Sequence, residues 1–211
     1  MNRHRLPPVT LAVLLSTVLG AAAQQHPNPE AYAKGLEDRE RVAEIQVDRV
    51  VAALQLAPGM TVADLGSGSG LFTRPLARSV APGGIAYAVD IDAALLKIVE
   101  RSATVAGIEN IRTVHAAPAD PSLPAPVDLI FICDTFHHLP DKPAYARTLF
   151  HYVKPGGKVA IIDFVSHWPA GHEAMRYTVD SLTGWMTAAG FTLQRTLDFP
   201  TDRFFTIYVR P

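Results

Sequence analysis

The chain has 211 residues, of which 48% are apolar and 18% are charged, and its formal net charge is −1. This length and composition suit one globular domain with an additional segment. A nearly neutral chain offers no basic surface for nucleic acid, so we expect no nucleic-acid partner. The single cysteine, Cys133, has no second cysteine with which to form an internal disulfide.

The N-terminus has the layout of an export signal. Asn2 to Arg5 is basic, Val9 to Leu19 is largely apolar, and Ala21 to Ala23 supplies small residues. This order predicts a Sec-type signal peptide over residues 1–23, cut after Ala23, and hence a periplasmic or secreted protein if the source is bacterial. We expect no stable membrane insertion after cleavage. The alternative is an uncleaved membrane-anchoring helix, although the run is shorter than the ~20 residues that span a bilayer.

Residues 24–57 form the next predicted segment, a polar linker followed by helix. Apolar residues from Val42 to Leu54 recur at steps of three and four residues, which predicts one or two helices within residues 31–56. Pro58 and Gly59 end this pattern. We therefore place the main domain at residues 58–211.

A glycine-rich loop follows the first predicted strand, residues 61–65. Gly66, Gly68 and Gly70 stand at alternate positions before a predicted helix. Bare backbone lets a ligand approach closely, and a helix N-terminus favours an anionic group. Leu71 occupies the third glycine position of the dinucleotide fingerprint, and no lysine occurs between Lys34 and Lys97 for a phosphate loop. The loop thus indicates a nucleotide-type pocket of another kind.

Strands and helices then alternate along the chain. The second strand, residues 85–89, ends at Asp90, whose carboxylate can accept hydrogen bonds from both hydroxyls of a ribose. Further strands are predicted at 111–114, 127–133, 159–163, 191–197 and 204–209. Helices are predicted at 71–80, 93–106, 142–153 and 178–189, with a proline-rich loop at 117–126 and a turn at 154–157. This alternation predicts a mainly parallel sheet with helices on both faces.

Several short motifs carry a family resemblance over roughly residues 36–210. They are Asp64 to Gly70, Ala88 to Asp92, Ala119-Asp120, Asp134 to Leu139, Lys154 to Lys158 and Ala188 to Phe191. In this order they resemble class I S-adenosylmethionine-dependent methyltransferases, and most closely the broad group similar to ubiquinone/menaquinone-biosynthesis methyltransferases. The resemblance implies a Rossmann-like three-layer α/β/α sandwich, with a mostly parallel seven-stranded sheet and an antiparallel last strand. It also implies methyl transfer from S-adenosylmethionine to a small-molecule acceptor.

The resemblance assigns roles to individual residues. Asp64 would help to hold the ammonium of the methionine part, Asp90 the ribose and Ile91 the adenine face. Asp120 would accept from the adenine amino group, and Asp134 would lie beside the sulfonium. The cofactor-binding set is then Asp64, Gly66, Ser67, Gly68, Gly70, Asp90, Ile91, Asp120 and Asp134.

His137 and His138 follow the fourth strand at the expected methyl-transfer edge. Histidine suits a general base near neutral pH, so both are candidate catalytic residues; the alternative is that they pack or hydrogen-bond a loop. The acceptor pocket is expected in the segment after the fifth strand, which carries His167, Trp168, His172 and Tyr177.

A metal site is considered and not predicted. Asp134 and Asp163 end adjacent strands and, with His137 or His138, could form a site like that of catechol-type O-methyltransferases, but Phe164 stands where those enzymes have asparagine. Two acids alone are weak support for magnesium. Two rivals to an enzyme of this class remain: a non-catalytic exported S-adenosylmethionine-binding protein, and a nucleotide-dependent oxidoreductase, which Leu71 disfavours.

Overall fold

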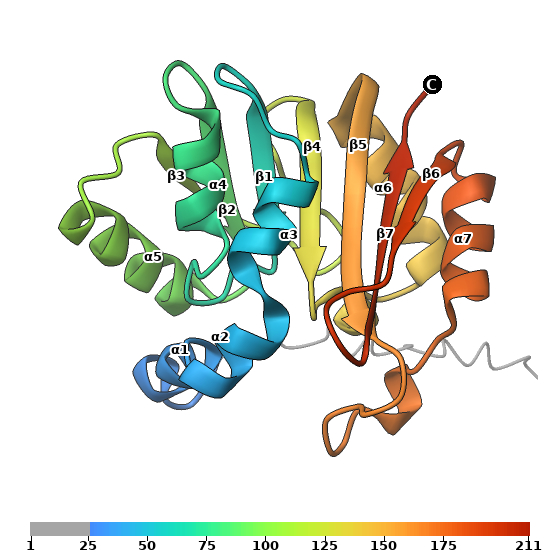
Figure 1. The fold of residues 1–211 in the computed structure, drawn as a ribbon, viewed down its shortest axis with the longest axis horizontal. Helices are drawn as coiled ribbons and strands as arrows, with labels where there is room; N and C mark the ends of the chain where they lie inside the picture. The colour runs from blue at the N-terminus through green and yellow to red at the C-terminus, as the bar shows by residue number, and fades with distance from the viewer. Residues whose placement is uncertain (1–25) are drawn as a thin grey trace, which may run out of the picture.

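The computed structural model describes residues 26–211, so the predicted signal peptide lies outside the described residues. Three short helices precede an alternation of strands and helices (Figure 1). In chain order the elements are α1 (Pro29–Leu36), α2 (Arg39–Ile45), α3 (Val47–Ala53), β1 (Thr61–Leu65), α4 (Thr73–Val80), β2 (Ile85–Asp90), α5 (Ala93–Val105), β3 (Ile111–His115), β4 (Val127–Cys133), η1 (Phe136–His138), α6 (Lys142–Tyr152), β5 (Val153–Phe164), η2 (Glu173–Met175), α7 (Val179–Ala188), β6 (Thr192–Leu197) and β7 (Arg203–Val209).

The seven strands form one sheet in the order β3-β2-β1-β4-β5-β7-β6. Strands β1 to β5 pair in parallel, and β7 runs antiparallel to both β5 and β6. This confirms the predicted Rossmann-like sheet. The strand order reverses between β1 and β4, and in such sheets ligands bind in the crevice outside the carboxyl ends of the strands at this point.

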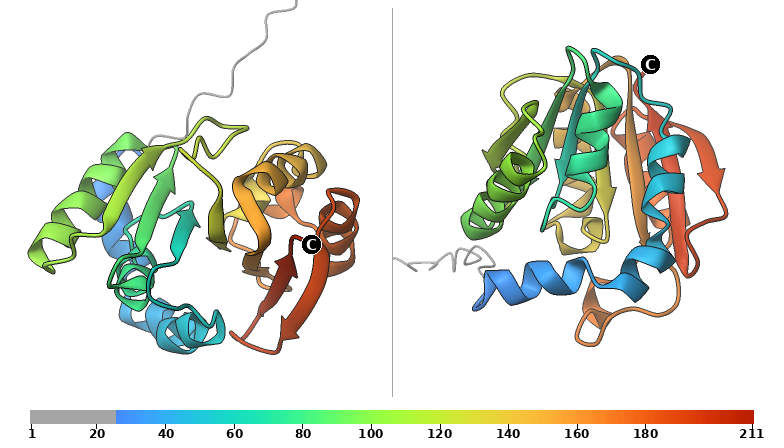
Figure 2. Two further views of the ribbon diagram at one scale, coloured as in Figure 1. Left: turned by 90° about the horizontal axis from the view of Figure 1, so that it is seen from above. Right: turned by 60° about the vertical axis from the view of Figure 1, so that its left-hand side comes forward.

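Helices cover both faces of the sheet (Figure 2). Side chains alternate along each strand, so Val62 and Leu129 pack under α3 and α4, while Ala63 and Ile130 pack under α6 and α7. Helix α5 packs beside α4 on Ala88 of β2. The predicted three-layer α/β/α sandwich is therefore confirmed.

The segment predicted as one or two helices folds as three. The Asp38 side chain accepts from the Glu40 N–H and caps α2, and Gln46 adopts a left-handed φ of 54° between α2 and α3. Helices α1 and α2 lie across the carboxyl ends of the strands (Figure 1). Within residues 26–211, no helix combines the length and the apolar character needed to cross a bilayer.

Two other local predictions need correction. The turn predicted at residues 154–157 is part of β5, because the Gly156 N–H donates to Arg210 O at 2.8 Å and the Arg210 N–H donates to Gly157 O at 2.9 Å. The helix after the glycine loop begins at Thr73 rather than Leu71. The short helices η1 and η2 were not predicted, since one helical turn is too short to show a periodicity.

Candidate functional site

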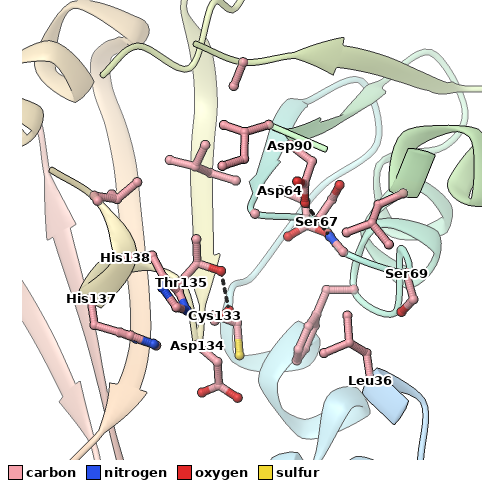
Figure 3. Close-up of a pocket in the computed structure, with 18 of the residues that line it drawn as sticks. Leu36, Asp64, Ser67, Ser69, Asp90, Cys133, Asp134, Thr135, His137 and His138 are labelled. Atoms are coloured by element: carbon pink, nitrogen blue, oxygen red, sulfur yellow. Dashed lines mark hydrogen bonds between the residues drawn. The ribbon is translucent and has the colours of Figure 1, made fainter. Parts of the chain in front are cut away.

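A cavity of about 500 Å³ lies at the carboxyl end of the sheet. Its walls come from the N-terminal helices, the glycine loop, the end of β2 and the segments that follow β3, β4 and β5. The glycine loop with its acids and the histidines lie on opposite sides of this cavity (Figure 3). The residues that line it include His26, Tyr32, Leu36, Arg41, Asp64, Gly66, Ser67, Gly68, Ser69, Asp90, Ile91, Ala116, Ala117, Pro118, Cys133, Asp134, Thr135, His137, His138, Phe164 and His172.

The glycine loop brings bare backbone to the cavity. Gly66 and Gly68 have φ values of 76° and 53°. A Cβ on Gly66 would lie 2.3 Å from the Thr135 side chain, and one on Gly68 would lie 2.6 Å from Leu36 Cδ1. The loop is therefore held tightly between α1 and the end of β4, and glycine is needed for both its backbone angles and its close contacts.

Polar atoms of this loop are available to a ligand. The hydroxyls of Ser67 and Ser69 are buried and have no hydrogen-bond partner among residues 26–211. Buried polar groups normally have partners, so unpaired ones that line a cavity favour a polar occupant. Gly70 lies outside the cavity lining; a Cβ there would lie 3.2 Å from Val99, so this glycine allows α5 to approach the loop.

Asp90 connects the end of β2 to the glycine loop. Its Oδ2 accepts from the Gly68 N–H and its Oδ1 accepts from the Asp92 N–H, both at 2.9 Å. Burial raises the pKa of the Asp90 carboxyl. Each carboxylate oxygen has a further lone pair, so Asp90 can also accept from hydroxyls in the cavity. Ile91 lines the cavity directly after it.

Asp64 lies deeper, at the end of β1. Its Oδ2 accepts from the Thr73 hydroxyl at 2.6 Å, and the residue is only 3% exposed. Burial raises the pKa of Asp64 to about 7. A cationic ligand group beside this carboxyl would favour its ionised form and lower that pKa.

Two predicted cofactor residues have other contacts. Asp120 lies outside the cavity lining; its Oδ1 accepts from the Tyr152 hydroxyl at 2.8 Å, and Ala116 to Pro118 line the cavity in its place. Asp134 lines the cavity, but its carboxylate accepts from Arg41 at 3.0 Å and from Arg203 at 2.8 Å. Its side chain points away from Asp64 and Asp90 (Figure 3).

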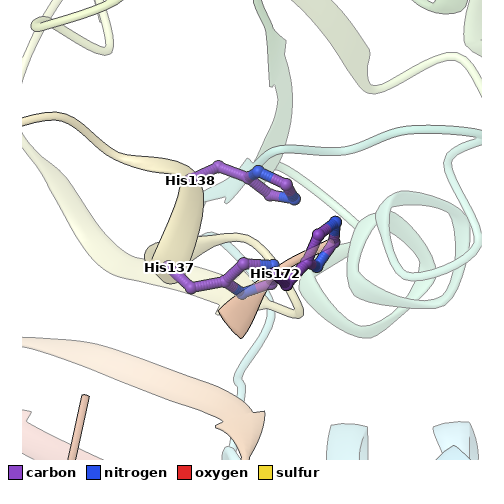
Figure 4. A group of neighbouring side chains, drawn as sticks. All are labelled: His137, His138 and His172. Carbon is purple, nitrogen blue, oxygen red and sulfur yellow. The ribbon is translucent and has the colours of Figure 1, made fainter. Parts of the chain in front are cut away.

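The two candidate catalytic histidines face the cavity together with a third. His137 Nδ1 lies 2.8 Å from Asp163 Oδ1, and its other ring nitrogen, Nε2, is buried. The imidazoles of His137, His138 and His172 converge on one space (Figure 4), with a ring nitrogen of each within 4.8 Å of the others. Burial, together with the neighbouring His137 and His172, lowers the pKa of His138 to about 4. His138 is therefore a neutral imidazole at pH 7 and a weak base.

Of the other residues after β5 that were expected to line the acceptor pocket, some pack beside His137 and Asp163 and one is exposed at the surface. Tyr177 donates to Asp163 Oδ2 at 2.8 Å, and the Trp168 ring packs edge-on against His137. His167 is exposed and pairs with Asp202. Asp163 therefore bonds to His137 and Tyr177, whereas Asp134 bonds to two arginines.

The segment that begins at His26 and continues into α1 supplies residues that sequence reasoning missed. His26 and Tyr32 line the cavity and stack on each other at 3.6 Å, and the His26 N–H donates to Asp92 Oδ2 at 3.0 Å. Thr135 lines it beside Gly66. The available signal for Tyr32 was an aromatic residue at the start of the predicted helical stretch, but its position over the sheet depends on tertiary contacts.

Comparisons with known proteins place this geometry in a class. A solved S-adenosylmethionine-dependent methyltransferase from Aquifex aeolicus has a TM-score of 0.77 at 24% identity, over 87% of this chain and 99% of that one. A possible exported protein from Bordetella parapertussis has a TM-score of 0.63 at 21% identity, over 81% of this chain and 67% of that one. The sheet topology and the position of the cavity at the switch point are those of the Rossmann-like methyltransferase fold.

Sequence comparison identifies the family. Residues 36–196 match the family model described as a methyltransferase domain, and the chain belongs to that family. The ubiquinone/menaquinone biosynthesis C-methyltransferase UbiE of Shewanella frigidimarina is 32% identical over 126 residues, which cover 58% of this chain and 49% of that protein. The chain spans about half the length of the curated relatives it matches.

Proposed function

We propose that this protein transfers a methyl group from S-adenosylmethionine to a small-molecule acceptor. The observation that carries the proposal is one cavity with two chemically different sides. One side has bare glycine backbone, free serine hydroxyls and two buried carboxyls; the other has a cluster of imidazoles. The family match and the methyltransferase from Aquifex aeolicus support the same cofactor.

The residues present fit this cofactor. Ser67 and Ser69 offer unpaired hydroxyls beside the glycine loop, where the methionine carboxylate would lie. The ammonium of the methionine part would lie beside Asp64 and favour the ionised form of its carboxyl. Asp90 can accept hydrogen bonds from the ribose hydroxyls. Apolar atoms of Ile91 and of Ala116 to Pro118 would enclose the adenine. A volume of about 500 Å³ is within the usual range of small-molecule sites.

The remaining residues would position the acceptor. When bound, the cofactor supplies a methyl carbon bonded to positively charged sulfur, which needs no further activation. Holding an acceptor in line with that carbon can contribute ~7–11 kcal/mol of the barrier reduction. Phe164 and His172 line the cavity near His137 and His138, so they would form the acceptor side. A role for His137 or His138 as general base stays a prediction.

Calorimetry tests the cofactor assignment. S-adenosylmethionine and S-adenosylhomocysteine should bind, and NAD should not. Asp90→Ala should remove most of the affinity, whereas Asp120→Ala, which changes an acid outside the cavity, should leave it unchanged. Tight NAD binding without S-adenosylmethionine binding would overturn the proposal. A screen of small acceptors for S-adenosylhomocysteine release then tests catalysis, because a non-catalytic carrier would bind the cofactor without turnover.

We also propose that the protein is exported. The basic, apolar and small-residue order of residues 1–23 supports this, and a relative in fold is described as a possible exported protein. Fractionation with N-terminal sequencing of the mature chain tests it. A periplasmic or secreted chain that begins at Gln24 is expected; an intact N-terminus in the membrane fraction would favour the anchored alternative, and an intact soluble cytosolic chain would overturn both.

A further inference from the structure

The histidine cluster on the acceptor side of the cavity has the features of a metal site. We propose that His137, His138 and His172 together bind a divalent transition-metal ion, with Zn²⁺ as the type ion. Three histidines with an open fourth position are a common ligand set of catalytic zinc, and neutral imidazole suits zinc, copper, nickel and iron rather than magnesium. Carboxylates are not part of this set, so it is unlike the acid pair considered from the sequence.

The geometry of the rings supports the proposal. One ring nitrogen of each histidine lies within 4.8 Å of the others (Figure 4). Ligand nitrogens about 3.3 Å apart surround a tetrahedral zinc with bonds of about 2.0–2.1 Å. The rings therefore need to close by ~1.5 Å at most, which small side-chain rotations supply.

Unpaired buried nitrogens give independent support. His137 Nε2 and His172 Nδ1 are buried and have no hydrogen-bond partner among the described residues. The His137 side chain is 1% exposed, so water does not readily satisfy it. A buried ring nitrogen without a partner is costly, and coordination of a metal ion would use its lone pair.

A carboxylate behind His137 completes the arrangement. Asp163 is fully buried, and its oxygens accept from the His137 N–H, the Phe164 N–H and the Tyr177 hydroxyl as well as facing His137 Nδ1. The contact between Asp163 Oδ1 and His137 Nδ1 keeps the imidazole proton on Nδ1 and directs the lone pair of Nε2 into the cluster. Metal-binding histidines usually have such a partner. Within residues 26–211, no lysine or arginine lies within ion-pairing distance of Asp163, so a cation on His137 Nε2 would offset the charge of this buried carboxylate.

The position of the cluster indicates a role, and this step rests on the proposed function. A divalent cation lowers the pKa of a hydroxyl or thiol that binds beside it. The acceptor would lose its proton to water, and its lone pair would form the new bond to the methyl carbon. The carbon–sulfur bond would break with its electron pair retained by sulfur. The acceptor class is therefore a small alcohol, phenol or thiol.

Zinc titration of the full, untagged chain tests the site directly. The protein is stripped with a chelator and titrated with Zn²⁺ against a chromophoric competitor, and Co²⁺ replaces Zn²⁺ to record the visible bands of a tetrahedral site. One ion per chain is expected. His172→Ala and His138→Ala should each weaken binding by about 100-fold or more, and Tyr177→Phe by about tenfold through Asp163. His167→Ala is the matched control, because this exposed histidine lies outside the cluster, and it should bind as the unchanged protein does.

The outcomes separate this proposal from the methyltransferase assignment. Circular dichroism and S-adenosylmethionine binding by the metal-free variants show that they remain folded. No saturable binding at micromolar free zinc, or equal affinity in His172→Ala and His167→Ala, would overturn the metal site and leave cofactor binding intact. Zinc binding without S-adenosylmethionine binding would instead overturn the proposed function. Methyl transfer to a hydroxyl or thiol that is equally fast before and after metal removal would refute the role of the ion.

Discussion

Asp64 makes cofactor binding depend on pH in a way that can be measured. Its carboxyl has a pKa of about 7 in the free protein because it is buried, so it is half protonated at neutral pH. An ammonium bound beside it requires the ionised form. Binding should therefore release a proton, and affinity should rise with pH. If Asp64 is fully ionised in the complex, affinity should increase by ~15-fold between pH 5.5 and 7.0.

Calorimetry in two buffers of different ionisation enthalpy counts the released protons. About half a proton per cofactor is expected at pH 7, and Asp64→Asn should lose this release because its side chain does not titrate. Methylthioadenosine, which lacks the ammonium, is a matched ligand control and should bind without releasing a proton. At pH 7 and below, the ligand's own amine, with an ordinary pKa of about 8, stays mostly protonated. Affinity that is flat between pH 5.5 and 7.0, or proton release that persists in Asp64→Asn, would refute the reasoning.

Other substitutions separate the cofactor loop from the core. Gly66→Ala places a Cβ 2.3 Å from Thr135 at a φ of 76°, so we expect at least a tenfold loss of cofactor affinity by calorimetry. Gly59→Ala is its control: φ is 87° but no atom lies within 4 Å of the added Cβ, so stability should fall by about 1 kcal/mol with affinity unchanged. Leu149→Ala removes a fully buried side chain between the sheet and α6 and should cost ~2–5 kcal/mol in urea unfolding, again without a change in affinity. Equal affinity in Gly66→Ala and Gly59→Ala, or weakened binding in Leu149→Ala, would contradict this division.

The layers of the fold could be predicted from the sequence, because apolar runs, turn residues and helical periodicity are local signals. Apolar runs between turns predicted β1, β2 and β4. The helix predicted at 178–189 matches α7, which the Thr178 side chain caps by accepting from the Ser181 N–H. The turn predicted at residues 154–157 failed because Gly156 and Gly157 pair with Arg210, which is more than fifty residues away in the chain. Such pairing has no local signature.

The site was predictable only where its residues share a motif. Asp64, Asp90 and the glycine loop lie within one strand–helix–strand unit, so their spacing carried the information. His172 and Tyr32 reach the cavity from a distant loop and helix, and the three-histidine cluster exists only because the residue before η2, His172, lies beside His137 and His138 of η1. Asp120 shows the opposite case: it stands in the expected motif, but the Tyr152 hydroxyl holds it outside the cavity.

Asp134 links these distant parts of the site. Its backbone has a left-handed φ of 50° directly after β4, and its carboxylate bonds to Arg41 on α2 and to Arg203 at the start of β7. One partly buried acid thus joins α2 to the sheet at the edge of the cavity. Because charge-assisted pairs to arginine are directional, this contact fixes where α2 lies above the glycine loop. Helices α1 and α2 of the predicted 24–57 segment are therefore walls of the site, and Asp134, the acid expected beside the sulfonium, holds α2 there through Arg41.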